Sequence, residues 1–257
     1  MRDARQFRAM ARHVLMNRYW WAVLATLIFG LLNGGCAALV FFSELDELED
    51  LIEEGLRIAP QYAGMAPAIL SLAGLFGLLL GLAFLFVGAA VELGYNRYLI
   101  AQYRAAGAPG LETLFSRFGI FWRAVGLRLL MLLKTLLWSL LLVVPGIVAA
   151  YRYALAPYLL AEDPSLAPFE AIEQSKALMQ GHKARLFRLH LSFAGWYLLL
   201  ALCAGIGAPL INAYAGTAVT GFYMERTGQL RPAAQAAAPA PGAPAQTAAE
   251  QTETEWI

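Results

Sequence analysis

The sequence is poor in charged residues and in cysteine. Only 14% of its 257 residues are charged and 60% are hydrophobic, whereas soluble domains are usually about half apolar. The chain is therefore too apolar for a soluble protein. Cysteine occurs only as Cys36 and Cys203, each within an apolar run, so we interpret both as small buried side chains and not as a disulfide scaffold.

Catalytic and metal-binding motifs are also missing from the sequence. The histidines His13, His182 and His190 have no Cys, Asp or Glu at metal-ligand spacing, and no nucleophile or phosphate-loop motif occurs. We therefore predict no catalytic residue, no metal site and no cofactor, and we expect the protein not to be an enzyme. Nucleic acid is not an expected partner.

Long apolar runs fill most of the chain. They cover residues 19–42, 67–93, about 124–161, about 187–204 and 208–224. A helix needs roughly 20 mostly apolar residues to cross a bilayer. The runs predict an all-α, polytopic membrane protein with about six transmembrane helices, its membrane domain spanning residues 19–228.

The charges are distributed unevenly around the first two runs. Residues 1–18 form a basic, amphipathic segment, whereas the loop at 43–66 carries seven carboxylates and one basic residue, Arg57. Loops rich in Lys and Arg stay on the cytoplasmic side. We therefore place both termini in the cytoplasm and the acidic loop outside it.

Two further segments are predicted from composition and spacing. Residues of about 165–181 fit a cytoplasmic amphipathic helix followed by basic side chains, which could contact anionic lipid headgroups or simply obey the positive-inside bias. Residues 229–257 are rich in Ala and Pro with few large apolar residues, so we predict a disordered cytoplasmic tail.

The apolar stretch of about 124–161 lies between two basic segments and must cross the membrane an even number of times. Proline and glycine favour a reversal of the chain, so Pro145 and Gly146 are the predicted outer tip of a helical hairpin. The arm after them, residues 147–161, is short for a full span. It either crosses obliquely or enters as a re-entrant half-helix.

Arg152 is the charge that this second arm carries into the membrane. Such an arginine usually faces a partner or a cavity, and the candidate partners are Glu92, Glu162 and Asp163. Pairing with Glu92 in a dry core would indicate a structural role. A wet cavity shared with Tyr151, Tyr153 and Tyr158 would indicate an anion or headgroup site.

Several segments of the second half resemble a known family. They are "LWSLL" at 137–141, "VPGI" at 144–147, "YRYALAPYLLAEDP" at 151–164, "EAIEQSKALMQGHKARLF" at 170–187 and "LSFAGW" at 191–196. This pattern is similar to the bacterial integral membrane family named domain of unknown function 975, over about residues 111–225. The resemblance implies a bacterial membrane protein without an assigned activity.

The resemblance also implies which residues occupy motif positions. They are Pro145, Gly146, Tyr151, Arg152, Tyr153, Asp163, Pro164, Gly181, His182 and Lys183. The leading functional hypothesis is a non-enzymatic scaffold, accessory or envelope-stress component of a bacterial plasma membrane. The alternatives are a transporter or lipid-handling protein that uses Arg152, and a membrane-embedded enzyme. Expected partners are the lipid bilayer and anionic headgroups; protein partners are not predicted.

Overall fold

A computed structural model describes residues 3–16, 18–33, 50, 52, 64–104, 109–202 and 207–230. All regular elements among these residues are helical, which confirms the all-α class. In chain order they are α1 (Ala4–Leu15), α2 (Tyr19–Leu32), α4 (Ala66–Arg104), the 3-10 turns η2 (Leu111–Phe115) and η3 (Phe118–Ile120), α5 (Phe121–Leu141), α6 (Val143–Tyr153), α7 (Ala156–Glu162), α8 (Pro168–Met179), α9 (Lys183–Leu202) and α10 (Ala208–Arg226).

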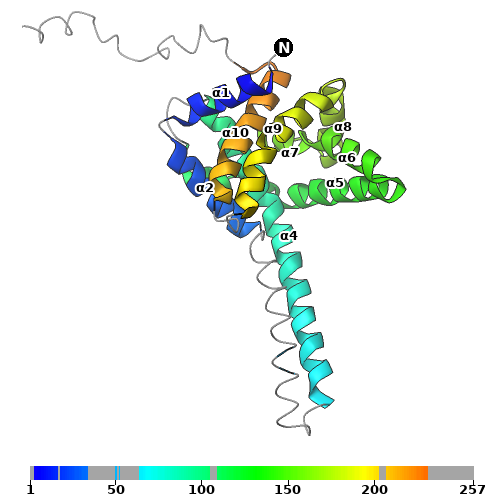
Figure 1. Ribbon diagram of the computed structural model, residues 1–257. Coiled ribbons are helices and arrows are strands. Elements are labelled where there is room, and N and C mark those ends of the chain that lie inside the picture. The colour runs from blue at the N-terminus through cyan, green and yellow to red at the C-terminus, as the bar shows by residue number, and fades with distance from the viewer. Residues whose placement is uncertain are drawn as a thin grey trace, which may run out of the picture.

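Helix α4 dominates the shape of the molecule. Its 39 residues extend over about 58 Å, and its N-terminal half projects away from the other described helices (Figure 1). None of the residues in its most apolar 18-residue window is buried. An exposed apolar helix of this length is what a lipid-facing span requires.

By length and composition, three helical segments of the described residues can cross a membrane. They are Pro67–Arg104, Leu111–Leu141 and Val143–Glu162, and a fourth is obtained if α1 and α2, which meet at 102°, count as one bent span. Helices α9 and α10, expected from the sequence to be spans, do not reach this threshold because both carry several polar or charged side chains. The six predicted crossings are therefore not confirmed.

Helix α10 forms the centre of a bundle and contacts α1, α2, α4 and α9. Its buried side chains run from Ala213 to Met224. The hydroxyls of Thr217 and Thr220 donate to the carbonyls of Ala213 and Gly216 in the same helix, so these polar groups are satisfied inside the core.

Helix α2 packs on the C-terminal half of α4 in the same bundle. The ring of Phe29 stacks on that of Tyr95, with 4.5 Å between their centroids. The hydroxyls of Thr26 and Tyr95 are hydrogen-bonded at 2.9 Å. The predicted hydrophobic run 19–42 thus contains a helix that belongs to the bundle core.

Helices α5 and α6 form the predicted hairpin, but its tip is not at Pro145 and Gly146. The only non-helical residue between the two helices is Leu142, which has extended backbone angles. Pro145 lies in the first turn of α6, where a proline disrupts no helical hydrogen bond. Gly146 instead permits close helix contact, because a Cβ atom there would overlap Ser139 Oγ and lie 2.8 Å from Ser139 Cα.

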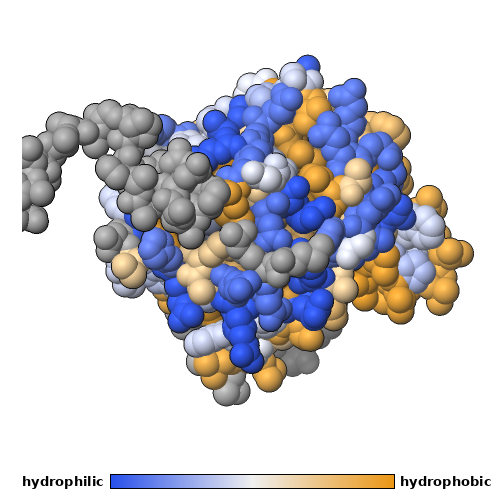
Figure 2. All heavy atoms as spheres, turned by 90° about the horizontal axis from the view of Figure 1, so that it is seen from above, coloured by the Kyte–Doolittle hydropathy of each residue, from blue (hydrophilic) through white to orange (hydrophobic). Residues whose placement is uncertain are grey.

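Helix α8 confirms the helix predicted at about 165–181. It buries Ala171, Ile172, Ser175 and Met179 and exposes polar residues on its other face. Seen from above, hydrophilic side chains dominate the face of the molecule, whereas the projecting hairpin is largely hydrophobic (Figure 2). Nearly all of the acidic loop 43–66, and the tail beyond Leu230, lie outside the described residues.

Candidate functional site

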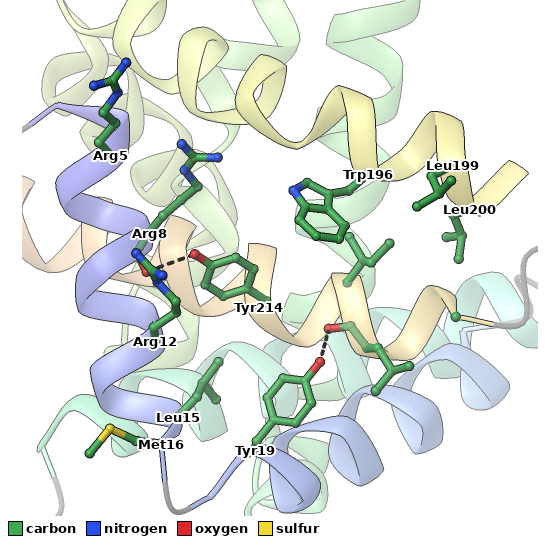
Figure 3. A pocket seen from close by; sticks show the side chains of 13 residues that line it. Arg5, Arg8, Arg12, Leu15, Met16, Tyr19, Trp196, Leu199, Leu200 and Tyr214 are labelled. Atoms are coloured by element: carbon green, nitrogen blue, oxygen red, sulfur yellow. Dashed lines mark hydrogen bonds between the residues drawn. The ribbon is translucent and has the colours of Figure 1, made fainter.

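A cavity of about 910 Å³ lies between α1, the start of α2, α9 and α10 (Figure 3). Three arginines of α1, namely Arg5, Arg8 and Arg12, line one side of it. Its other walls are mainly apolar and include Leu15, Trp196, Leu199, Leu200, Leu210 and Ile211. A basic edge and an apolar wall therefore meet in one cavity.

The sequence of α1 explains how its arginines come to share a face. Asp3 and Gln6 form a capping box that begins the helix. Phe7, Ala11 and Leu15, spaced four residues apart, bury one side of the helix. Arg5, Arg8 and Arg12 are spaced three and four positions apart. Their side chains therefore form a second stripe along the helix, beside the buried one.

Hydrogen bonds between distant segments hold α1 in place over α9 and α10. The Tyr214 hydroxyl donates to the Arg8 carbonyl at 3.0 Å, and Arg8 Nη1 donates to the Ser192 carbonyl at 3.4 Å. At the far end, the Tyr19 hydroxyl donates to the Leu210 carbonyl at 3.2 Å (Figure 3). Phe7 also packs edge-on against Phe222. The cavity is therefore formed by residues from both ends of the chain.

The apolar wall of the cavity is open to the surroundings. Trp196 is 54% exposed and Leu199 is 55% exposed, although both are large hydrophobic residues. No acidic side chain lines the cavity among the described residues. Guanidinium groups bind carboxylate and phosphate through charged hydrogen bonds. The cavity can therefore accept a ligand that joins an anionic group to a hydrocarbon chain.

A second cavity, of about 240 Å³, lies between α4, α5 and the α6–α7 segment. Glu92 and Arg128 line it, and their Oε2 and Nη1 atoms are 3.8 Å apart. Arg128 also donates to Asn33 Oδ1 at 2.8 Å. Glu92, one of the three candidate partners of Arg152, thus lies close to Arg128 instead.

Arg152 does not share a cavity with the neighbouring tyrosines. It lines neither of the two cavities, and no described residue forms an ion pair with it. The Tyr151 hydroxyl is 3.2 Å from His190 Nδ1, whereas Tyr153 is buried. Tyr158 is also buried and stacks on Tyr223. Tyr151 and Tyr158 thus pack α6 and α7 against α9 and α10, whereas Tyr153 packs in a cluster with residues of α4, α5 and α8.

The Asp-Pro and Gly-His-Lys motif positions lie at helix boundaries. Asp163 follows α7 and accepts hydrogen bonds from the hydroxyl and backbone N–H of Ser165, which lower the pKa of its carboxyl. The carbonyl of Pro164 accepts a hydrogen bond from Arg123. These contacts fix the turn between α7 and α8.

Gly181 has a φ of +71°, the left-handed conformation that ends α8, and Lys183 begins α9. His182 lies between them. Burial lowers the pKa of its imidazole, and the positive charges of Arg226 and Arg185 lower it further. His182 is therefore neutral at pH 7, which suits a structural position better than a headgroup contact.

A family match covers the helices α6 to α10 of this architecture. Residues 140–229 match the family described as Protein of unknown function (DUF975). The match confirms the resemblance seen in the sequence. It includes the α9 and α10 walls of the larger cavity and all the motif positions, but not α1 with its arginines. Neither curated proteins nor solved structures gave a match to the chain.

Sequence reasoning did not single out the three arginines of the cavity. These arginines indicated only the orientation of the chain. Their place in a cavity depends on contacts between α1 and the distant helices α9 and α10, which no local pattern reveals. The spacing of Arg5, Arg8 and Arg12 was the available local signal, since an arginine stripe flanking an apolar one is typical of a helix at a membrane surface.

Ser175 provides a test of how the hairpin is attached to α8. Its Oγ accepts from the Leu155 N–H at 3.2 Å and donates to the Arg152 carbonyl at 2.9 Å, and the residue is fully buried. Ser175→Ala leaves both groups unpaired, so we expect a loss of about 1–3 kcal/mol in unfolding free energy. Thermal unfolding in detergent measures it. Ser116→Ala, at an exposed turn, is the control and should change little.

Proposed function

We propose that the protein is an integral membrane protein of a bacterial plasma membrane that binds an anionic amphiphile in the cavity between α1, α9 and α10. The observation that carries the proposal is the meeting of an arginine stripe and an open apolar wall in one cavity. This function belongs to the lipid-handling class, with Arg5, Arg8 and Arg12 in the role that the sequence suggested for Arg152.

The size and charge of the cavity support a lipid-like ligand. Cavities that hold small molecules usually measure about 300–1,000 Å³, and this one measures about 910 Å³. Each basic residue near an anionic headgroup contributes roughly 1 kcal/mol. The partly exposed Trp196 and Leu199 provide a route by which a hydrocarbon chain reaches the cavity directly from the bilayer.

The orientation follows from the basic residues. In the proposed arrangement α2, α4, α9 and α10 cross the membrane, and α1 lies along the cytoplasmic surface with both termini on that side. Six crossings would also require the α5–α6 hairpin to cross twice. We propose a binding role without catalysis, because the described residues that line the cavity are arginine, methionine, tyrosine, tryptophan and other apolar residues, with no paired nucleophile and base among them.

Native mass spectrometry of the purified full-length protein tests the proposal. The probes are phosphatidylglycerol and oleate as anionic amphiphiles, and phosphatidylcholine as a zwitterionic one. We expect Arg5→Gln/Arg12→Gln to reduce binding of the anionic probes by roughly tenfold or more, since about 1 kcal/mol is lost at each site. The two anionic probes distinguish a bilayer phospholipid from a free fatty acid.

The matched control is Lys183→Gln/Arg188→Gln, which removes two positive charges from the start of α9 without touching the cavity. It should bind like the wild type. Equal losses in both double variants, or equal binding of phosphatidylcholine and phosphatidylglycerol by the wild type, would contradict a specific anionic site.

A further inference from the structure

The α5–α6 hairpin carries no charged side chain beyond its base. Residues 135–151 include none, and Lys134 and Arg152 mark the two ends of this stretch. Around the turn, the five consecutive residues 140–144 are large, aliphatic and 65–83% exposed. A tip that emerged into water would expose about five large apolar side chains together, which soluble surfaces rarely do.

Helix α8 holds the base of the hairpin next to a polar face of the molecule. The Lys134 ammonium lies 4.6 Å from the centroid of the Phe169 ring on α8. On the other arm, Ser175 of α8 bonds to the Arg152 carbonyl. The opposite face of α8 exposes Glu170, Glu173 and Gln174 to solvent. Lys134 and Arg152, which flank the apolar stretch, thus both lie beside a helix whose outer face is polar.

Both helical segments of the hairpin are long enough to cross a membrane when counted in full, but the parts that lie beyond Lys134 and Arg152 are too short to do so. Residues 135–141 and 143–151 supply seven and nine helical residues, which extend about 11 and 14 Å. The hydrocarbon core is about 30 Å thick. Even if it stood upright, the hairpin would end near the middle of the membrane.

The backbone at the turn suits a tip that lies in hydrocarbon, where unpaired N–H and C=O groups are costly. Leu142, the only non-helical residue there, donates its N–H to the Trp138 carbonyl and accepts from the Gly146 N–H, both at 3.2 Å. Pro145 lies in the first turn of α6 and has no N–H to leave unpaired. These two bonds and the missing proline N–H lower the number of backbone groups at the tip that would need water.

We infer that the α5–α6 hairpin is re-entrant: it inserts its tip into the acyl chains of the leaflet next to α8 and returns to the same side. The exposed apolar face of the hairpin then contacts the hydrocarbon of the bilayer that α4 crosses. The hairpin then contributes no crossing, and α2, α4, α9 and α10 supply four. This inference rests on the proposed membrane integration but not on the ligand of the cavity.

Thiol accessibility in the full-length protein tests the inference. In a Cys36→Ala/Cys203→Ala background, single cysteines are placed by Val143→Cys at the tip, Gln174→Cys on α8 and Asp46→Cys in the acidic loop. A membrane-impermeant maleimide is applied to intact spheroplasts and to inside-out vesicles. Denaturation in SDS, where all three variants should react equally, gives the reference value.

Gln174→Cys should react only in inside-out vesicles and Asp46→Cys only in spheroplasts. Val143→Cys should react at least about tenfold more slowly than either from both sides, because thiolate is the reactive form and apolar surroundings disfavour it. Val143 is 71% exposed, so lipid must provide the shielding. Rapid reaction of Val143→Cys in spheroplasts would show that the hairpin spans the membrane. Rapid reaction of the same variant in inside-out vesicles would show that the hairpin lies in water. Either outcome overturns the inference.

Discussion

Protein carrying Gly94→Ala should unfold at a clearly lower temperature than the wild type, with a loss of about 3 kcal/mol in unfolding free energy. Gly94 lies in α4 where η2 crosses it, and a Cβ atom there would overlap the carbonyl oxygen of Leu114 and lie 2.5 Å from its carbonyl carbon. Leu114 is fully buried, so its backbone has no free space into which to move.

Gly74→Ala, in the same helix, is the matched control for this substitution. No described atom lies within 4 Å of a Cβ atom built at Gly74. Because alanine also favours helix more than glycine does, this variant should be as stable as the wild type or slightly more so. Thermal unfolding of both proteins in the same detergent compares them, and equal unfolding temperatures would contradict the proposed close contact at Gly94.

Glu162→Leu should also destabilise the protein strongly, by about 2–3 kcal/mol, the scale of a charged hydrogen bond. The Glu162 carboxylate accepts hydrogen bonds from Arg104, the Tyr223 hydroxyl and Gln229. It therefore joins the ends of α4, α7 and α10. Arg104 is partly exposed, so water screens the ion pair, and the buried Tyr223 hydroxyl accounts for much of the expected loss.

Glu173→Leu is the control for the loss of a carboxylate. Glu173 forms an ion pair with Lys176 on the exposed face of α8. An exposed pair of this kind contributes at most about 1 kcal/mol. Chemical unfolding in mixed micelles should therefore separate the two variants clearly, and a loss at Glu162 no larger than at Glu173 would show that the three-partner cluster adds little stability.

The sequence predicted those features that depend on local patterns. The hairpin and α8 both follow from apolar spacing and helix boundaries. The turn was predicted at the wrong residues because proline and glycine each suit more than one kind of backbone position. Proline fits the first turn of a helix as well as a reversal, and Gly146 serves close contact with Ser139.

Features that depend on distant contacts could not be predicted. Glu92 lies 36 positions from Arg128 and 60 from Arg152, and nothing in the local sequence indicates which arginine it meets. The cavity is a stronger example, since Arg8 and Tyr214 are 206 positions apart. Periodicity shows which face of a helix is apolar but not which other helix covers it.

The link between Arg8 and Tyr214 has a consequence for biogenesis. Helix α1 is synthesised before its docking surface on α10, which lies 206 positions further along the chain. At about 5–20 residues per second, the ribosome needs roughly 10–40 s to make the 206 intervening positions. During that time α1 lacks its hydrogen bond with Tyr214 and the contact between Phe7 and Phe222. A nascent chain that stops before α10 therefore lacks one wall of the cavity, and the cavity forms only after α10 has been synthesised.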